Sequence, residues 1–238
     1  MMQSVKRTAR RVYDRIQGLP LMTSAELDAA SLITYVNKPN PVILEIGCND
    51  GEQTLWFDSL FEMPQIYCFE PDPRAIKRFK ANVRDLPNIH LYPVALSNSS
   101  GEAIFHQSHG QASDPERIAM MPDGWDLSGS LHKPKEHLDY YPWVKFDSTI
   151  RVKTLTLDQW YQESGLVQID FIWMDVQGAE LDVIQGGRQA LAQTKFLYTE
   201  YSVRELYEGQ ATLKTLLKQL PEFAPLVRYP GDLLLKHK

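Results

Sequence analysis

Short runs of hydrophobic residues alternate along the chain with stretches that place hydrophobic residues at helical spacing. Continuous apolar runs of this length are typical of buried parallel strands, and they occupy residues 42–46, 66–70, 89–96, 169–175 and 195–201. Helical spacing occupies residues 52–62, 73–84, 156–164, 179–191 (interrupted at Gly186-Gly187) and 203–220. Residues 226–238 read as two strands around a turn. This order predicts an α/β fold with a doubly wound, mostly parallel seven-stranded sheet, helices on both faces and a C-terminal antiparallel hairpin.

One region departs from the alternation. Residues 107–149 lie between short strands predicted at 102–106 and 150–156, and they show little periodicity. A loop of this length inside a compact domain is usually a functional lid or is disordered. We therefore predict one domain over residues 39–238 with a lid-like insertion at about 107–149, preceded by a basic, helical extension over residues 1–38.

Composition narrows the class of protein. The 238 residues include 25 Lys and Arg and 30 Asp and Glu, a net charge of −5, and only two cysteines. These values exclude a disordered polyelectrolyte and a disulfide-rich miniprotein, and they favour a cytoplasmic protein that does not bind nucleic acid. No apolar run approaches the roughly 18 residues of a membrane span.

The N-terminal arm has the opposite charge. It carries five basic residues, namely Lys6, Arg7, Arg10, Arg11 and Arg15. Such an arm is either a solvated helix or a segment that contacts an anionic membrane surface or a phosphate-bearing substrate.

The predicted strand ends carry acids. In a doubly wound sheet, ligands bind beyond the carboxyl ends of the strands. After the first strand, Glu45 precedes a turn that contains Gly47, Asn49 and Gly51. The glycine spacing lacks the third glycine of the dinucleotide pattern, and carboxylates there suit a cationic ligand with an amino group, such as S-adenosylmethionine.

Later strand ends extend this cluster. Glu70 lies 19 residues past Gly51, the usual distance for an acid that binds ribose hydroxyls, and Asp72 either supports it or caps the next helix. Ala95, Leu96 and Ser97 suit an adenine ring or form a plain turn. Asp175 follows the fourth strand; Glu180 then either stabilises a helix dipole or flanks the substrate. Glu200, among apolar neighbours, either has a raised pKa or has a partner.

Several of these segments together resemble the FkbM family of S-adenosylmethionine-dependent methyltransferases. The matching segments are residues 44–51, 69–73, 94–101, 169–187, 198–202 and 231–238. The resemblance implies S-adenosylmethionine as cofactor and methyl transfer to a hydroxyl, often of a sugar or polyketide. The family string usually has Lys and Glu where this chain has Trp173-Met174 and Gln177. Because one acid is missing there, we expect no metal.

These inferences assign roles to individual residues. For cofactor binding we predict Glu45, Gly47, Asn49, Gly51, Glu70, Asp72, Ala95, Leu96, Ser97, Asp175 and Gln177. For catalysis we predict Asp175, Glu200 and His132, the favoured base among the histidines His106, His109, His132 and His137. The predicted acceptor is a hydroxyl of a glycan or related small molecule, and for its binding we predict Glu180, Ser130, Trp125, Tyr140 and Trp143. The three aromatic residues are included because aromatic rings stack on sugar faces.

Three other expectations accompany these assignments. A nicotinamide-dependent oxidoreductase and a non-catalytic binding module are the alternative functions. A leucine-rich face on the last helix, with Leu213, Leu216, Leu217 and Leu220, would permit a homodimer.

Overall fold

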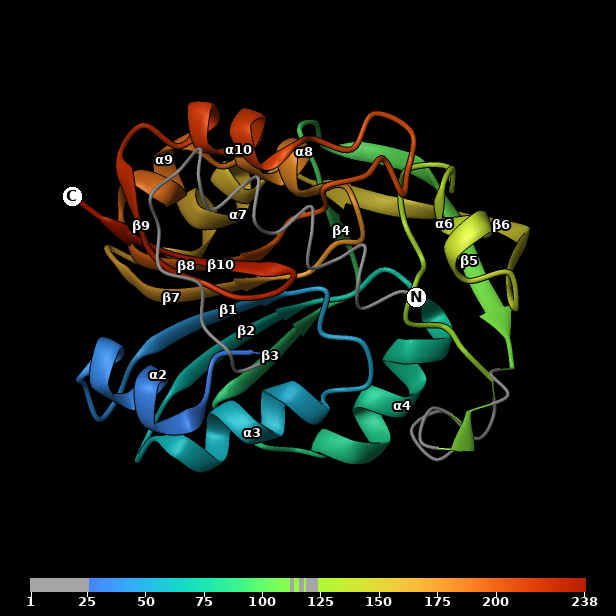
Figure 1. Ribbon diagram of the computed structural model, residues 1–238. Coiled ribbons are helices and arrows are strands. Elements are labelled where there is room, and N and C mark those ends of the chain that lie inside the picture. The colour runs from blue at the N-terminus through green and yellow to red at the C-terminus, as the bar shows by residue number, and fades with distance from the viewer. Residues whose placement is uncertain (1–25, 112–113, 116–117, 119–123) are drawn as a thin grey trace.

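A computed structural model describes residues 26–111, 114–115, 118 and 124–238 of the chain. The basic residues of the N-terminal arm lie outside these ranges. The centre of the fold is a seven-stranded sheet in the order β3-β2-β1-β7-β8-β10-β9 (Figure 1). Its strands are β1 (Val42–Ile46), β2 (Gln65–Phe69), β3 (Ile89–Tyr92), β7 (Ile169–Met174), β8 (Thr194–Glu200), β9 (Phe223–Arg228) and β10 (Asp232–His237). Strand β10 pairs antiparallel with both β8 and β9, whereas the other pairs are parallel, which confirms the predicted sheet.

Helices cover both faces of the sheet (Figure 1). One face carries α2 (Ala29–Val36), α3 (Glu52–Leu60) and α4 (Pro73–Val83); the other carries α7 (Leu157–Ser164), α8 (Glu180–Gln185), α9 (Arg188–Ala192) and α10 (Leu213–Gln219). Successive side chains of a strand point to opposite faces, so Leu44 and Ile46 belong to one hydrophobic core and Ile43 to the other. The same alternation turns Glu45 toward α3, where the hydroxyl of Thr54 donates a hydrogen bond to it.

The predicted helix boundaries have visible chemical causes. The side chain of Asp72 accepts a hydrogen bond of 2.9 Å from the backbone N–H of Arg74, and Pro73 occupies the first helical position of α4. Thr156 caps α7 in the same way, by accepting a bond of 3.1 Å from the N–H of Gln159. Gly165 ends α7 in the left-handed conformation, with φ of 69°.

The prediction of an irregular segment over residues 107–149 was partly wrong. Its two ends belong to a separate three-stranded sheet, ordered β4-β6-β5 and made by β4 (Ala95–Leu96), β5 (Gly101–Gly110) and β6 (Val144–Leu155). A short helix, α6 (His137–Tyr140), lies between β5 and β6. Much of β5 and β6 is exposed or half-buried, so their backbone pairing leaves little hydrophobic pattern in the sequence.

The last helix is shorter than predicted. Thr212 caps α10 at its start, and residues 203–212 form turns and isolated bridges instead of helix. Leu213, Leu216 and Leu220 are buried in the hydrophobic core of the chain itself. The leucine face is therefore not available for a dimer contact, which removes the reason for that prediction. Within the described ranges, no helix has the length and hydropathy needed to cross a membrane.

Candidate active site

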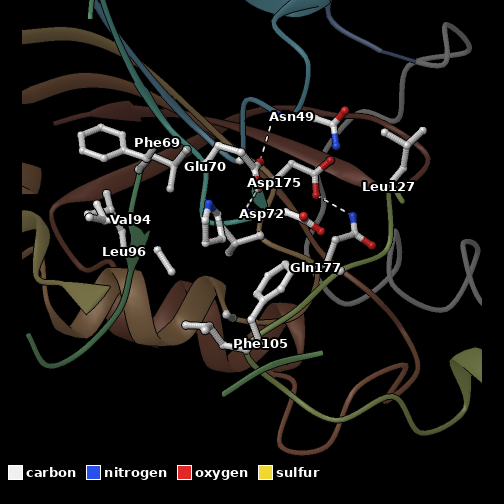
Figure 2. Close-up of a pocket in the computed structure, with 18 of the residues that line it drawn as sticks. Asn49, Phe69, Glu70, Asp72, Val94, Leu96, Phe105, Leu127, Asp175 and Gln177 are labelled. Carbon is white, nitrogen blue, oxygen red and sulfur yellow. Dashed lines mark hydrogen bonds between the residues drawn. The ribbon is translucent and has the colours of Figure 1, made fainter. Parts of the chain in front are cut away.

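A cavity opens at the carboxyl ends of the parallel strands, beside β1 and β7, where the strand order reverses direction (Figure 2). The space between its walls amounts to about 820 Å³, including the open mouth. Its lining comprises Ile46, Gly47, Asn49, Phe69, Glu70, Pro71, Asp72, Val94, Ala95, Leu96, Phe105, Asp126, Leu127, Gly129, Leu131, Asp175, Val176, Gln177 and Ala179. This position is where open α/β sheets bind their ligands.

The turn after β1 approaches the cavity with its backbone. Gly47 has φ of 93°, and a Cβ atom placed on it would lie 1.9 Å from the backbone oxygen of Asp175. Only glycine fits such an approach at such a dihedral angle. Gly51, with φ of 83°, instead packs against Phe79 and Val83 of α4 and lies outside the lining. The two predicted glycines thus serve different purposes, one at the cavity and one at a helix contact.

Glu70 is held at the cavity by backbone N–H groups. One carboxylate oxygen accepts a bond of 3.0 Å from the N–H of Asn49 and the other a bond of 2.8 Å from the N–H of Asp72 (Figure 2). Burial raises the pKa of Glu70 to about 7, and the two N–H donors oppose that rise. Each oxygen keeps a second lone pair for a ligand, so Glu70 can still accept hydrogen bonds from a vicinal diol.

The capping alternative for Asp72 is confirmed. Besides capping α4, its carboxylate forms an ion pair of 2.6 Å with Arg74 and accepts a bond of 3.1 Å from the side-chain amide of Gln107. Asp72 lines the cavity, yet its oxygens are already engaged by these donors.

One wall of the cavity is apolar. Phe69, Val94, Leu96, Phe105, Leu127 and Leu131 contribute to it, and Figure 2 shows Phe69, Val94 and Leu96 grouped away from the carboxylates. Ala95 and Leu96, which the sequence predicted to contact an adenine ring, also line the cavity. Ser97 does not line the cavity, and its N–H donates a bond of 3.0 Å to the backbone oxygen of Leu155. An apolar wall opposite fixed carboxylates suits a ligand with a flat ring at one end and polar groups at the other.

Asp175 lines the cavity directly after β7, away from Phe69, Val94 and Leu96 (Figure 2). Its backbone N–H donates a bond of 2.9 Å to the oxygen of Ile46, which continues the β1–β7 pairing by one residue. The side-chain amide of Gln177 donates to the Asp175 carboxylate at 2.6 Å. Burial raises the pKa of Asp175, and the hydrogen bonds from Gln177 oppose that rise.

Glu200 and Glu180 are buried near Asp175 and do not line the cavity. Glu200 is within hydrogen-bonding reach of Asp175, and burial together with the Asp175 charge raises the pKa of Glu200 well above its ordinary value. Two buried carboxyl groups in contact do not readily ionise together, and the hydrogen bond between them lowers the pKa of Asp175 and raises that of Glu200, which favours the proton on Glu200. Glu180 accepts a bond of 3.0 Å from the N–H of Gly178, and burial raises its pKa to about 7.

His132 is not placed to act as the base. One ring nitrogen lies 2.7 Å from the backbone oxygen of Glu208 and the other 2.8 Å from the carboxylate of Asp182, and the side chain does not line the cavity. The hydrogen bond to Asp182 raises the pKa of His132. Its position joins the insertion to α8 and to the 203–212 segment. The sequence placed His132 in a flexible lid, whereas the fold uses both of its nitrogens as structural contacts.

The predicted acceptor residues of the insertion also lie outside the lining. The Trp125 ring packs edge-on against Trp143 with centroids 5.0 Å apart, and Tyr140 lies under the guanidinium of Arg204 at 4.4 Å. The hydroxyl of Ser130 donates a bond of 2.7 Å to the backbone oxygen of Gln177. These contacts hold the insertion to itself and to the strand ends.

The structure adds a charged residue that the sequence did not single out. Asp126 lines the cavity and forms an ion pair of 2.7 Å with Arg78 of α4, whose guanidinium also donates a bond of 3.1 Å to the side chain of Asn49. Phe105, Leu127 and Leu131 enter from the same part of the chain. No local motif marks Asp126, because its partner Arg78 is 48 positions away in the sequence.

Glu45, in contrast, belongs to a buried contact on the α3 side of the sheet and does not reach the cavity. Burial raises its pKa to about 8. Among the described residues, no group of three or more His, Cys, Asp or Glu side chains could hold a metal ion.

Comparison with known proteins agrees with this geometry. Residues 45–229 match the model of the methyltransferase FkbM domain. The chain is 45% identical over 232 residues to the 2-O-methyltransferase NoeI of Sinorhizobium fredii, covering 96% of this chain and 92% of that protein. It is 23% identical over 177 residues to the hexuronic acid methyltransferase AglP of Haloferax volcanii, covering 74% of this chain and 62% of that protein. The chain therefore belongs to the FkbM family of methyltransferases.

Proposed function

We propose that this methyltransferase transfers a methyl group to a hydroxyl of a sugar or glycan acceptor, with Asp175 as the general base. The observation that carries the proposal is the Asp175 carboxylate, which accepts a bond of 2.6 Å from Gln177 in a cavity that Glu70 and an apolar wall also line. The names of two relatives, a 2-O-methyltransferase and a hexuronic acid methyltransferase, support a sugar hydroxyl as the acceptor.

The cofactor is S-adenosylmethionine, which supplies a methyl group activated by a sulfonium charge. The residues of the cavity fit this molecule. Glu70 would accept hydrogen bonds from the ribose hydroxyls, and Phe69, Val94 and Leu96 would contact the adenine ring. Asp126 and Asp175 give the remaining side a negative potential, which favours a ligand with a sulfonium and an amino group.

Asp175 has the position and charge to take a proton from the acceptor. A sugar hydroxyl is a weak nucleophile at neutral pH, and a positioned base accelerates such a step by roughly 10²–10⁴-fold. Since the Asp175 backbone is paired to β1, its carboxylate is held on a rigid element. The cavity walls align the acceptor oxygen with the methyl group, which contributes an orientational advantage of its own.

Two measurements test the proposal. Calorimetric titration with S-adenosylmethionine, S-adenosylhomocysteine and NAD should give heat with the two sulfur compounds and none with NAD. Methyl transfer from labelled cofactor should then be assayed on neutral monosaccharides, uronic acids and oligosaccharides. Binding of NAD alone would favour the oxidoreductase alternative. Cofactor binding without labelling of any carbohydrate class would overturn the sugar acceptor.

The remaining expectations stay predictions. Membrane contact depends on the N-terminal arm, which lies outside the described residues. Sedimentation of the full chain with vesicles of anionic and of neutral lipids would test it, and pelleting only with anionic vesicles is the expected result. A cytoplasmic location and the absence of a nucleic-acid partner follow from composition and are likewise untested.

A further inference from the structure

Gln177 occupies an unusual place between the cavity and the buried carboxyl groups. Its backbone has φ of 51°, in the left-handed region that side chains other than Gly and Asn seldom adopt. The Ser130 hydroxyl donates to its backbone oxygen at 2.7 Å, so the insertion holds this conformation in place. A costly backbone conformation with a dedicated partner points to a requirement on where the side chain goes.

The contacts of the Gln177 amide show that requirement. Its nitrogen donates to Asp175 at 2.6 Å and lies 3.3 Å from a carboxylate oxygen of Glu200. Its oxygen is 3.1 Å from the hydroxyl of Tyr207, which also lies 2.9 Å from the backbone oxygen of Ser128. An amide has two N–H donors and a carbonyl acceptor, so this orientation gives one donor to each acid and leaves the oxygen for the phenol.

We propose that Gln177 is a positioning residue, whose amide decides which of the two acids, Asp175 or Glu200, keeps their shared proton and which faces the acceptor as a base. This inference rests on the proposed function, in which Asp175 is that base. The short bond to Asp175 favours its ionised form, and Glu200 then keeps the proton. A neutral amide does this without adding a charge, whereas a carboxylate at position 177 would place a third acid in the same buried space.

Other acidic groups near Asp175 and Glu200 raise the pKa values of these two acids, so the N–H donors of Gln177 have an effect to oppose. Glu180 of α8, Asp232 of β10 and Glu26, which precedes α2, all face the pair together with the phenol of Tyr207. Their negative charges, where present, favour protonation of Asp175, as does burial. The amide hydrogens of Gln177 oppose that effect, so their removal should change the titration of Asp175 directly.

The test uses two variants at position 177 and a matched control. Gln177→Met keeps the length of the side chain and removes the donors, whereas Gln177→Glu keeps the shape and adds an acid. Gln107→Met makes the same chemical change at another buried amide, which donates to Asp72 at 3.1 Å. The first readout is the pH titration of the Asp175 carboxyl carbon by ¹³C NMR, assigned by the signal lost in Asp175→Asn. The second is the pH dependence of kcat.

In Gln177→Met we expect the Asp175 titration and the acidic limb of kcat to move up by about one pH unit or more, because a hydrogen bond to a charged group is lost. Turnover then falls by about tenfold below the limb and recovers at higher pH. Gln177→Glu should shift both further. Gln107→Met should leave both at their wild-type positions. Affinity for S-adenosylhomocysteine, which also reports folding, should change by less than about threefold in all three variants.

An unshifted Asp175 titration in Gln177→Met would overturn the inference, whatever happens to activity. So would a loss of cofactor affinity in Gln177→Met, which would make Gln177 a cofactor ligand, or an equal shift in Gln107→Met. A shifted titration in a protein that methylates no carbohydrate would support the proton arrangement and refute the proposed function, so the two failures can be told apart.

Discussion

Glu70 and Asp175 both line one cavity and are held by different kinds of partner. Backbone N–H groups of Asn49 and Asp72, 21 and 2 positions away in the sequence, bind Glu70. Asp175 depends on side chains, chiefly the Gln177 amide and Glu200, and Gln177 in turn contacts Tyr207 and Ser130. The path of the main chain therefore fixes Glu70, the proposed cofactor ligand. Side chains fix Asp175, the proposed base, and substitution can change them without changing the fold.

The largest effect should come from Asp175→Asn. If Asp175 is the base, turnover at neutral pH should fall by roughly 10²–10⁴-fold, far more than the affinity for S-adenosylhomocysteine. Asparagine keeps the size of the side chain and loses the ability to accept a proton. Steady-state kinetics with calorimetry measures both quantities. Turnover equal to wild type would refute the catalytic role and leave the non-catalytic alternative open.

The next effect tests the close approach between the backbones of Gly47 and Asp175 at the cavity. Gly47→Ala should lower the free energy of unfolding by more than about 3 kcal/mol, because its Cβ meets the backbone of Asp175 and cannot be accommodated by a side-chain shift. Gly165→Ala is the matched control. It has φ of 69° and no atom within 4 Å of the added Cβ, so it should cost only about 1–2 kcal/mol. Urea unfolding compares the two, and equal losses would show that the contact with Asp175 is unimportant.

Glu70→Gln should weaken cofactor binding by about tenfold to a hundredfold, since a charged acceptor is lost and an amide NH₂ then faces a backbone donor. The control Glu52→Gln changes an exposed acid at the start of α3 and should leave affinity unchanged. Titration with S-adenosylhomocysteine gives the comparison. Wild-type affinity in Glu70→Gln would remove Glu70 from the cofactor site.

The last effect is a pH dependence of stability and concerns Glu45, the acid that does not reach the cavity. Its carboxyl group has an ordinary pKa of 4.5 and a pKa of about 8 in the fold, so the folded state binds more protons between these values. The free energy of unfolding should thus fall as pH rises from 5 to 8, by at most about 1.4 kcal/mol per pH unit, and level off above 8. Glu45→Gln should make this slope shallower and leave cofactor affinity intact, while Glu70 and Glu180, whose pKa values burial raises to about 7, still contribute a slope of the same sign. Equal slopes in the wild type and the variant would show that Glu45 does not contribute.

The sequence was most informative where a short segment carries its own signal. Asp72 and Pro73 predicted the start of α4, Thr156 the start of α7, and Gly186-Gly187 the break between α8 and α9, because caps and helix breaks depend on neighbouring residues. The β5–β6 ribbon escaped prediction because its pairing is between backbones far apart in sequence and its side chains are largely exposed. Trp125 and Tyr140, predicted for the acceptor, and His132, predicted as the base, lie outside the cavity lining for a related reason, since they contact partners that no spacing reveals.

The sequence by itself determined the order of strands and helices, and hence the edge at which acids gather, because hydrophobic period and capping are local properties. It also contained the family's motifs. Only the tertiary structure decided which acids face the cavity: Glu70 and Asp175 do, whereas Glu45 turns to α3 and Glu180 and Glu200 stand behind. The alternation of side chains within β1 turns Glu45 away from the cavity, and the contacts of Gln177 with Tyr207 and Ser130 hold the Asp175 side chain in place. The contacts of Gln177 join segments that are distant in the chain, and their energy depends on burial, which exists only in the folded protein.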